Sequence, residues 1–222
     1  MTSVVEVKKL LKPLTTKHQD LCVSGKLLAI KPVTHLARGI YIGRTSSADC
    51  FTPFVAVNCL FEPRATFKFN YGEEIYPKKK GLWLFSREGV NEELADRIED
   101  LALPRLHEVK TIEDFLHYGL KGHFFAGTLE YAPLRKLYIY LALGYLQAAG
   151  EILQQFSKHP QHWAEMAHTS EHFTELMDVV RPLVYAQDKP AIAALLHKWE
   201  VYSVKQLKLE KYWQKTPFPI EL

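Results

Sequence analysis

Residues 21–61 read LCVSGKLLAIKPVTHLARGIYIGRTSSADCFTPFVAVNCLF, and this stretch decides the fold class. It is rich in β-branched and aromatic residues and is interrupted by Gly, Pro and Ser, a pattern typical of strands joined by turns. We predict strands at 21–30, with a bulge at Gly25, at 36–42 and at 54–61. Because the connections are short, consecutive strands are expected to run antiparallel.

Two further strands are predicted downstream, at 66–71 and 82–85. In the first of them, three aromatic residues alternate with polar ones, which places the aromatic side chains on one face. The strand at 54–61 is apolar on both faces: Val55, Val57, Cys59 and Phe61 on one, Phe54, Ala56 and Leu60 on the other. We therefore expect this strand to be central and covered on both sides.

Helical periodicity occupies the rest of the chain. Residues 3–18 carry apolar side chains at helical spacing, and Pro13 is expected to end or kink this helix. After residue 90 we predict helices at 91–103 (with Asn91 as N-cap), 111–119 (capped by Thr111), 133–157, 161–179, 188–199 and 201–213.

The fold class that follows is α+β. It has an N-terminal helix, an antiparallel sheet of about five strands within residues 21–86, and a mainly helical C-terminal half packed on that sheet. We expect one domain over residues 1–222, with a sheet-rich part at 1–88 and a helical part at 89–222.

Composition excludes several classes of protein. Of 222 residues, 47% are hydrophobic and 24% charged, which is ordinary for a globular chain and excludes collagen-like or disordered proteins. The longest uncharged run, residues 137–150, is shorter than the ~20 residues of a membrane span, so a buried helix is expected. The N-terminus lacks a signal-peptide pattern, and the three cysteines form no C-x-x-C pair, which favours a cytoplasmic location.

The charge is unevenly distributed along the chain. Residues 1–90 carry 14 Lys and Arg against 7 Asp and Glu, whereas residues 91–222 carry 14 against 18. This asymmetry predicts a basic surface that faces a protein partner with an acidic surface. The candidate binding residues are Arg38, Arg64, Lys68, Lys78, Lys79 and Lys80. As an alternative, Lys78–Lys80 is a solvated hairpin turn.

Aromatic residues next to these cations resemble strands that stack nucleic-acid bases. A net charge of +3 is weak for that role, and aromatic side chains that face a core cannot stack on bases. The sequence therefore argues against nucleic acid as the partner.

Residues 168–172 read HTSEH and fit H-x-x-E-H, the inverted zinc-protease signature. On a helix His168 and His172 project from one face, and Glu171 lies close enough to act on a metal-bound water. Such a site needs a third protein ligand, and the 50 residues after His172 contain no convincing glutamate. The segment fits a plain amphipathic helix equally well, so a metal-dependent hydrolase stays the alternative function.

Other catalytic patterns are missing. The sequence has no G-x-S-x-G elbow and no phosphate-binding glycine loop, and Cys59 lies within an apolar strand, where thiols are usually inert. We predict no catalytic residue, no cofactor and no metal.

One motif resembles a known group of proteins. The pattern P-x-x-H-x-x-R-G-I is followed by an apolar strand that closes on a proline and then by a segment with an aromatic residue and a glycine. The residues are Pro32, His35, Arg38, Gly39, Ile40, Phe54, Pro63, Phe69 and Gly72. Over residues 26–76 the chain resembles small bacterial cytoplasmic proteins of unassigned function, some of which neutralise toxins. The resemblance implies an interaction protein of the immunity or inhibitor kind and no catalytic residue.

The same motif also has a structural interpretation. Arg38 shares a strand face with Ile40 and Ile42, so its guanidinium lies beside apolar groups and needs a partner, either Glu62 or a ligand. Gly39 indicates a bulge or a close approach of two strands. Taken together, the sequence favours a non-enzymatic binding protein and does not predict its oligomeric state.

Overall fold

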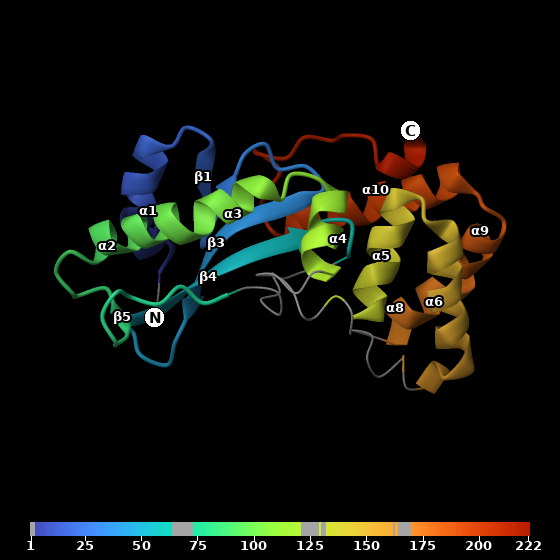
Figure 1. Ribbon diagram of the computed structural model, residues 1–222, viewed down its shortest axis with the longest axis horizontal. Helices are drawn as coiled ribbons and strands as arrows, with labels where there is room; N and C mark the ends of the chain where they lie inside the picture. Colours follow the sequence, from blue (N-terminus) through green and yellow to red (C-terminus); the bar gives the residue numbers. More distant parts are fainter. Residues whose placement is uncertain (1–2, 64–72, 121–128, 130–131, 162, 164–169) are drawn as a thin grey trace.

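The computed structural model describes residues 3–63, 73–120, 129, 132–161, 163 and 170–222 (Figure 1). The first half holds α1 (Val4–Lys17), β1 (Leu21–Ser24), β2 (Leu27–Ile30), β3 (Leu36–Arg44), β4 (Cys50–Cys59) and β5 (Trp83–Leu84). Next come α2 (Val90–Arg97), a π-helical turn (Ile98–Ala102), α3 (Leu103–Glu108), α4 (Ile112–Leu120), α5 (Pro133–Leu143) and α6 (Leu146–Lys158). The chain ends with α8 (Ser170–Glu175), a second π-helical turn (Leu176–Val180), α9 (Arg181–Tyr185), α10 (Lys189–Gln206) and the 3₁₀ turn η3 (Pro219–Glu221).

The sheet is an antiparallel meander in the order β1-β2-β3-β4-β5, as predicted. Its longest pairing joins β3 to β4, from Leu36 opposite Cys59 to Arg44 opposite Phe51. The single strand predicted at 21–30 is wrong, because Gly25 takes a φ of 59° and turns the chain into the β1–β2 hairpin. The strand predicted at 66–71 lies outside the described residues.

Gly39 allows β2 and β3 to approach closely. A Cβ atom at this position would lie 1.8 Å from the carbonyl oxygen of Leu28, so any side chain would push the two strands apart. The close approach predicted for this glycine is therefore confirmed.

Both faces of the sheet are buried. The main core joins side chains of β3 and β4, such as Ile40 and Val57, to the apolar faces of α1, α2 and α3. On the other face, a second core packs Ala29 and Ala37 against Val204, near the end of α10, and Leu209, which follows that helix. The prediction that the strand at 54–61 is covered on both sides is confirmed, since Val57 lies in the first core and Leu60 in the second.

The N-terminal helix runs through Pro13 and ends at Lys17, so the predicted break does not occur. Ser3 and Glu6 form a capping box at its start, which satisfies two backbone N–H groups. Pro13 lies on the exposed side of the helix. The helix is held against the sheet, before and after this proline, by the buried residues Val7, Leu10, Leu11 and Leu14.

Several helix boundaries differ from the predicted ones. The helix predicted at 133–157 is interrupted at Gly144, whose φ of 75° ends α5 in a left-handed cap before α6 begins. The helices predicted at 188–199 and 201–213 form one helix, α10, which is capped by Asp188 and ends at Gln206. The N-cap expected at Asn91 is instead Gly89. The cap predicted at Thr111 is confirmed, since its hydroxyl accepts from the N–H of Asp114.

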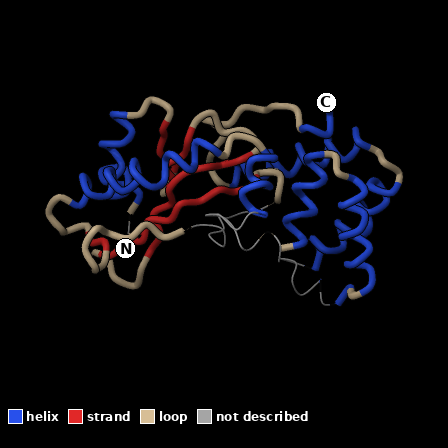
Figure 2. The backbone as a smooth tube through the Cα atoms, in the orientation of Figure 1, coloured by secondary structure: helices blue, strands red, loops and turns tan. Residues whose placement is uncertain are grey.

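The arrangement places the two halves of the chain at opposite ends of an elongated molecule. The sheet with α1, α2 and α3 occupies one end, and α5, α6, α8 and α9 form a helical group at the other (Figure 2). α10 packs against α5, α9 and η3 in the helical group, and its last turn and the chain after it return to the sheet. Within the described ranges, no helix combines the length and the apolar character needed to cross a membrane.

A glycine-to-alanine pair tests this account of the packing. Gly39→Ala is expected to cost about 3 kcal/mol or more of unfolding free energy, because the new Cβ meets backbone that cannot move alone. Gly150→Ala, in the middle of α6, is expected to stabilise by up to about 1 kcal/mol, since its Cβ would make only ordinary contacts. Urea denaturation of both variants measures the difference, and a similar effect of the two substitutions would contradict the close approach at Gly39.

Candidate functional site

Arg38 was predicted as a binding residue, and the structure places it inside the molecule. Its side chain lies on the core-facing side of β3, 8% exposed, and its Nη1 donates to the carbonyl oxygens of Leu106 (3.2 Å) and Val109 (2.9 Å). These carbonyls belong to the C-terminal end of α3, where a helix has unsatisfied acceptors and attracts a cation. Burial lowers the pKa of Arg38, while the carboxylates of Asp114 and Asp20 oppose that shift. Arg38 therefore joins the sheet to α3, and the partner suggested earlier, Glu62, pairs with Arg135 instead.

The turn that contains Lys78, Lys79 and Lys80, called the lysine turn below, lies on the surface, and part of its positive charge is neutralised by acidic side chains. The backbone N–H of Lys78 donates to Glu93 (2.7 Å), and its ammonium group lies 3.3 Å from the carboxylate of Asp96. Lys79 and Lys80 are exposed. Arg64 and Lys68, the other predicted binding residues, lie outside the described residues.

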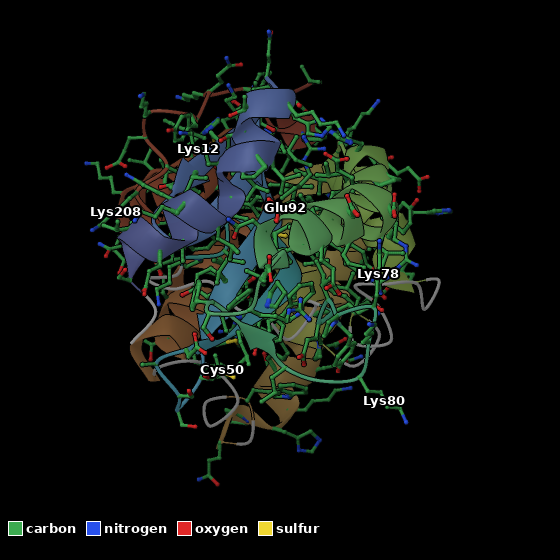
Figure 3. The ribbon with its side chains drawn as sticks, turned by 90° about the vertical axis from the view of Figure 1, so that its left-hand side faces the viewer. Lys12, Cys50, Lys78, Lys80, Glu92 and Lys208 are labelled. Atoms are coloured by element: carbon green, nitrogen blue, oxygen red, sulfur yellow. The ribbon has the colours of Figure 1, made fainter. Side chains whose placement is uncertain are left out.

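Cations at this end of the molecule are spread over several sides. In Figure 3, Lys12 and Lys208 lie toward one side of the view and Lys78 and Lys80 toward the other, with Glu92 between them. The labelled lysines therefore do not form one contiguous patch at the sheet end of the molecule.

The side chains of the H-x-x-E-H segment lie outside the described part of the structure. His168 lies outside the described residues, and only the backbone of Glu171 and His172 is described, within α8. Among the described residues, no group of three or more His, Cys, Asp or Glu side chains is placed to hold a metal ion. The three cysteines are buried thiols, and burial raises the pKa of Cys22.

A cluster of polar groups surrounds the buried carboxylate of Glu200, where α10 meets the residue that precedes β3. We call it the polar centre and define it by His35, His197, Glu200, Phe218 and Glu221. The carboxylate of Glu200 is fully buried and lies 2.8 Å from Nδ1 of His35 and 3.6 Å from Nδ1 of His197. Burial of a carboxylate is costly unless it is paired, so the hydrogen bond to His35 stabilises it in place, whereas His197 lies at ion-pair distance and makes no hydrogen bond to it.

His35 also holds the C-terminal segment. Its Nε2 lies 3.0 Å from the hydroxyl of Thr216 and 3.2 Å from the carbonyl oxygen of Pro217. A neutral ring with its proton on Nδ1 accepts from Thr216, whereas an imidazolium donates to Pro217. Either protonation state keeps the segment attached.

The aromatic ring of Phe218 fills the polar centre. It is fully buried and stacks on His35 with ring centroids 4.0 Å apart, while His197 lies 4.8 Å away on a tilted plane. Glu221 closes the arrangement, because its carboxylate accepts from the N–H of Phe218 (2.6 Å) and lies 2.9 Å from Nε2 of His197. Burial opposes ionisation of Glu221, but these two contacts outweigh it and lower its pKa.

A second buried ion pair lies next to α10 and joins α5 to the chain after β4. Nε of Arg135 in α5 donates to Glu62 at 3.0 Å, and both side chains are 3% exposed. The hydroxyl of Ser203, one turn after Glu200, donates to the carbonyl oxygen of Glu62. α10 is therefore joined by polar contacts to β3, to the end of β4 and to the C-terminus.

An open groove lies on the surface of the helical group, along α6. Two hollows, with volumes of about 610 and 530 Å³, share the four residues Leu146, Gln147, Glu151 and Gln187. We call the combined feature the α6 groove. Its remaining lining residues are Leu116, Tyr140, Gly144, Tyr145, Ala148, Gly150, Gln154, Val184, Tyr185 and Lys189.

Aromatic and amide side chains line much of this groove. Tyr145 and Tyr185 are 47% and 59% exposed, which is high for residues with large rings. Tyr140 lies beside Tyr145, with ring centroids 6.0 Å apart. Gln147 and Gln154 add amide groups along α6.

Two left-handed connectors line the groove. Gly144 separates α5 from α6 and directs Tyr145 outward. Gln187 has a φ of 55°, an uncommon conformation for a residue with a side chain, and it follows α9 in the turn to α10. Backbone hydrogen bonds from Gln187 to Val184 and from Asp188 to Leu183 hold this turn.

The groove does not follow from local sequence patterns, because its exposed tyrosines, Tyr145 and Tyr185, lie about 40 positions apart. His35 belongs to a predicted motif, but its partner in α10, Glu200, carries no sequence signal. Comparisons of the chain with protein-family models, with curated proteins and with solved structures find no match. The resemblance of residues 26–76 to small bacterial proteins therefore stays a prediction.

The contribution of the buried His35–Glu200 pair to stability can be tested by comparing the effects of substituting two histidines, His35 and His18. His35→Ala is expected to lower the free energy of unfolding by about 3 kcal/mol, because it leaves the Glu200 carboxylate buried beside one fewer partner. His18→Ala breaks a more exposed pair with Glu99 and is expected to cost about 1 kcal/mol or less. Urea denaturation gives both values, and equal costs would show that the polar centre does not stabilise the fold.

Glu221 predicts a pH dependence of stability. Because its pKa is lower in the folded chain, the ionised carboxylate stabilises the fold above its unfolded pKa of about 4.3, and this contribution disappears as the pH falls through the lower folded value. Glu221→Gln should therefore be less stable than the parent protein at neutral pH, and the gap should narrow at pH 3.

The matched control is Glu210→Gln, which removes a carboxylate from an exposed position of the same segment, away from Phe218 and His197. Urea unfolding at a series of pH values compares the two variants. A gap for Glu221→Gln that does not change with pH would contradict the assigned contacts.

Proposed function

We propose that this protein is a non-enzymatic binding protein that holds a segment of a partner polypeptide in the α6 groove. The observation that carries the proposal is the lining of the groove by exposed tyrosine and glutamine side chains. Tyrosine offers a large contact area with few rotatable bonds, and amide groups pair with peptide N–H and C=O groups. This combination is typical of surfaces that bind other proteins.

The length of the groove favours a polypeptide over a single small molecule. Its lining residues on α6 and the preceding junction run from Gly144 to Gln154, which corresponds to about 15 Å along a helix. That distance accommodates roughly four or five residues of an extended chain. A role of the immunity or inhibitor kind, in which the bound segment belongs to a target protein, is compatible with such a groove.

A second candidate surface is the lysine turn. Lys79 and Lys80 are exposed and would suit the partner with an acidic surface that the charge distribution predicts. Both surfaces can be compared in one experiment.

The test is selection of short random peptides displayed on phage against the full-length protein, followed by measurement of Kd for the enriched peptides. We expect Tyr145→Ala and Tyr185→Ala each to weaken binding about tenfold, as is common for an aromatic residue at the centre of an interface. The fold should persist in both variants, because both rings are largely exposed.

Two tyrosines elsewhere provide matched controls. Tyr76 and Tyr202 are 60% and 47% exposed and do not line the groove, so Tyr76→Ala and Tyr202→Ala should leave Kd unchanged. Loss of binding in the combined Lys79→Glu and Lys80→Glu variant alone would transfer the function to the lysine turn. Enrichment of no peptide, or equal binding by all variants, would overturn the proposal.

A further inference from the structure

Resting on the proposed function, we infer that the α6–α9 part of the groove receives an arginine side chain from the partner segment. This part is the hollow of about 530 Å³ between α6 and α9. Its size exceeds that of a single guanidinium group, so the arginine would enter it as one residue of a longer bound chain.

A ring and a carboxylate meet in this hollow. Tyr185 lies over Gly150, since a Cβ built on Gly150 would be 3.5 Å from Cε1 and 3.9 Å from Cδ1 of the ring. Glu151 is the next residue along α6 and lines the same hollow. Gln147 donates to the Glu151 carboxylate at 3.4 Å, which orients it along the exposed face of α6.

The charge of the hollow favours a cation. Among the described residues that line it, Glu151 is the one with a charged side chain. The nearest lysine in the groove, Lys189, lines the neighbouring hollow at the α5–α6 junction. An incoming positive charge therefore meets a carboxylate in this part of the groove.

The chemistry of the lining selects arginine over lysine. A guanidinium group stacks on a tyrosine ring and can pair with a carboxylate through two parallel hydrogen bonds. Its remaining N–H groups can donate to the amide oxygens of Gln154 and Gln187, which line the same hollow. A lysine ammonium has three donors and no planar face, so it would satisfy fewer of these acceptors.

The experiment uses a groove-dependent peptide from the phage selection and measures Kd for the full-length protein. In the peptide, each arginine is replaced in turn by citrulline, which keeps the planar shape and removes the charge. We expect one such replacement to weaken binding about tenfold on the parent protein and to have little further effect on the Glu151→Gln variant. Tyr185→Phe, which keeps the ring face, should retain binding, and Tyr185→Leu should not.

The outcomes separate this inference from the proposed function. Groove-dependent peptides without arginine, or a citrulline effect that is unchanged in Glu151→Gln, would overturn the arginine site and leave the binding function in place. Absence of any groove-dependent peptide would overturn both. Equal affinity for N-acetyl-arginine amide and for the whole peptide would show that the groove binds a small guanidinium compound, which contradicts the partner segment.

Discussion

The buried carboxylate of Glu200 is the constraint on which the helical half of the molecule depends. Moving such a group out of water costs several kcal/mol unless cations or hydrogen-bond donors surround it. The compensation here comes from the hydrogen bond of His35, which precedes β3, and from His197, whose ring lies 3.6 Å away, one turn earlier in α10. Since the same two imidazoles flank Phe218, one charge determines how α10, the first long strand and the C-terminal segment fit together.

Local patterns made much of the fold predictable. The alternation of apolar residues in β3 and β4 placed Arg38 beside Ile40, and the need of its guanidinium for a partner followed from that position. The positions at which helices end or continue were harder to predict, because they depend on contacts with residues far away in the sequence. Gly144 ends a helix next to Ile220 of the C-terminal turn, and α10 continues through the buried Glu200, whose carboxylate pairs with His35 from a distant part of the chain.

The candidate site was less predictable than the fold for a related reason. A count of charges does not show which cations have acceptors inside the protein, and Arg38 binds carbonyl groups of a helix almost 70 residues away. Lys78 contacts acids of α2 that belong, in sequence, to the acidic half. Tyr145 and Tyr185 belong to no sequence motif. They line the same groove because of the chain turns at Gly144 and at Gln187, which is in the left-handed conformation.

The polar centre and the groove are physically connected, which bears on how the groove could bind. The turn η3 carries Glu221, held by His197, and Ile220, which lies within about 3.5 Å of where a Gly144 side chain would begin. Gly144 in turn lines the groove. A groove whose wall is held by such contacts loses little conformational freedom when a partner binds, so more of the interaction energy appears as affinity. The polar centre would therefore support the proposed recognition indirectly, through the turn η3 and Ile220.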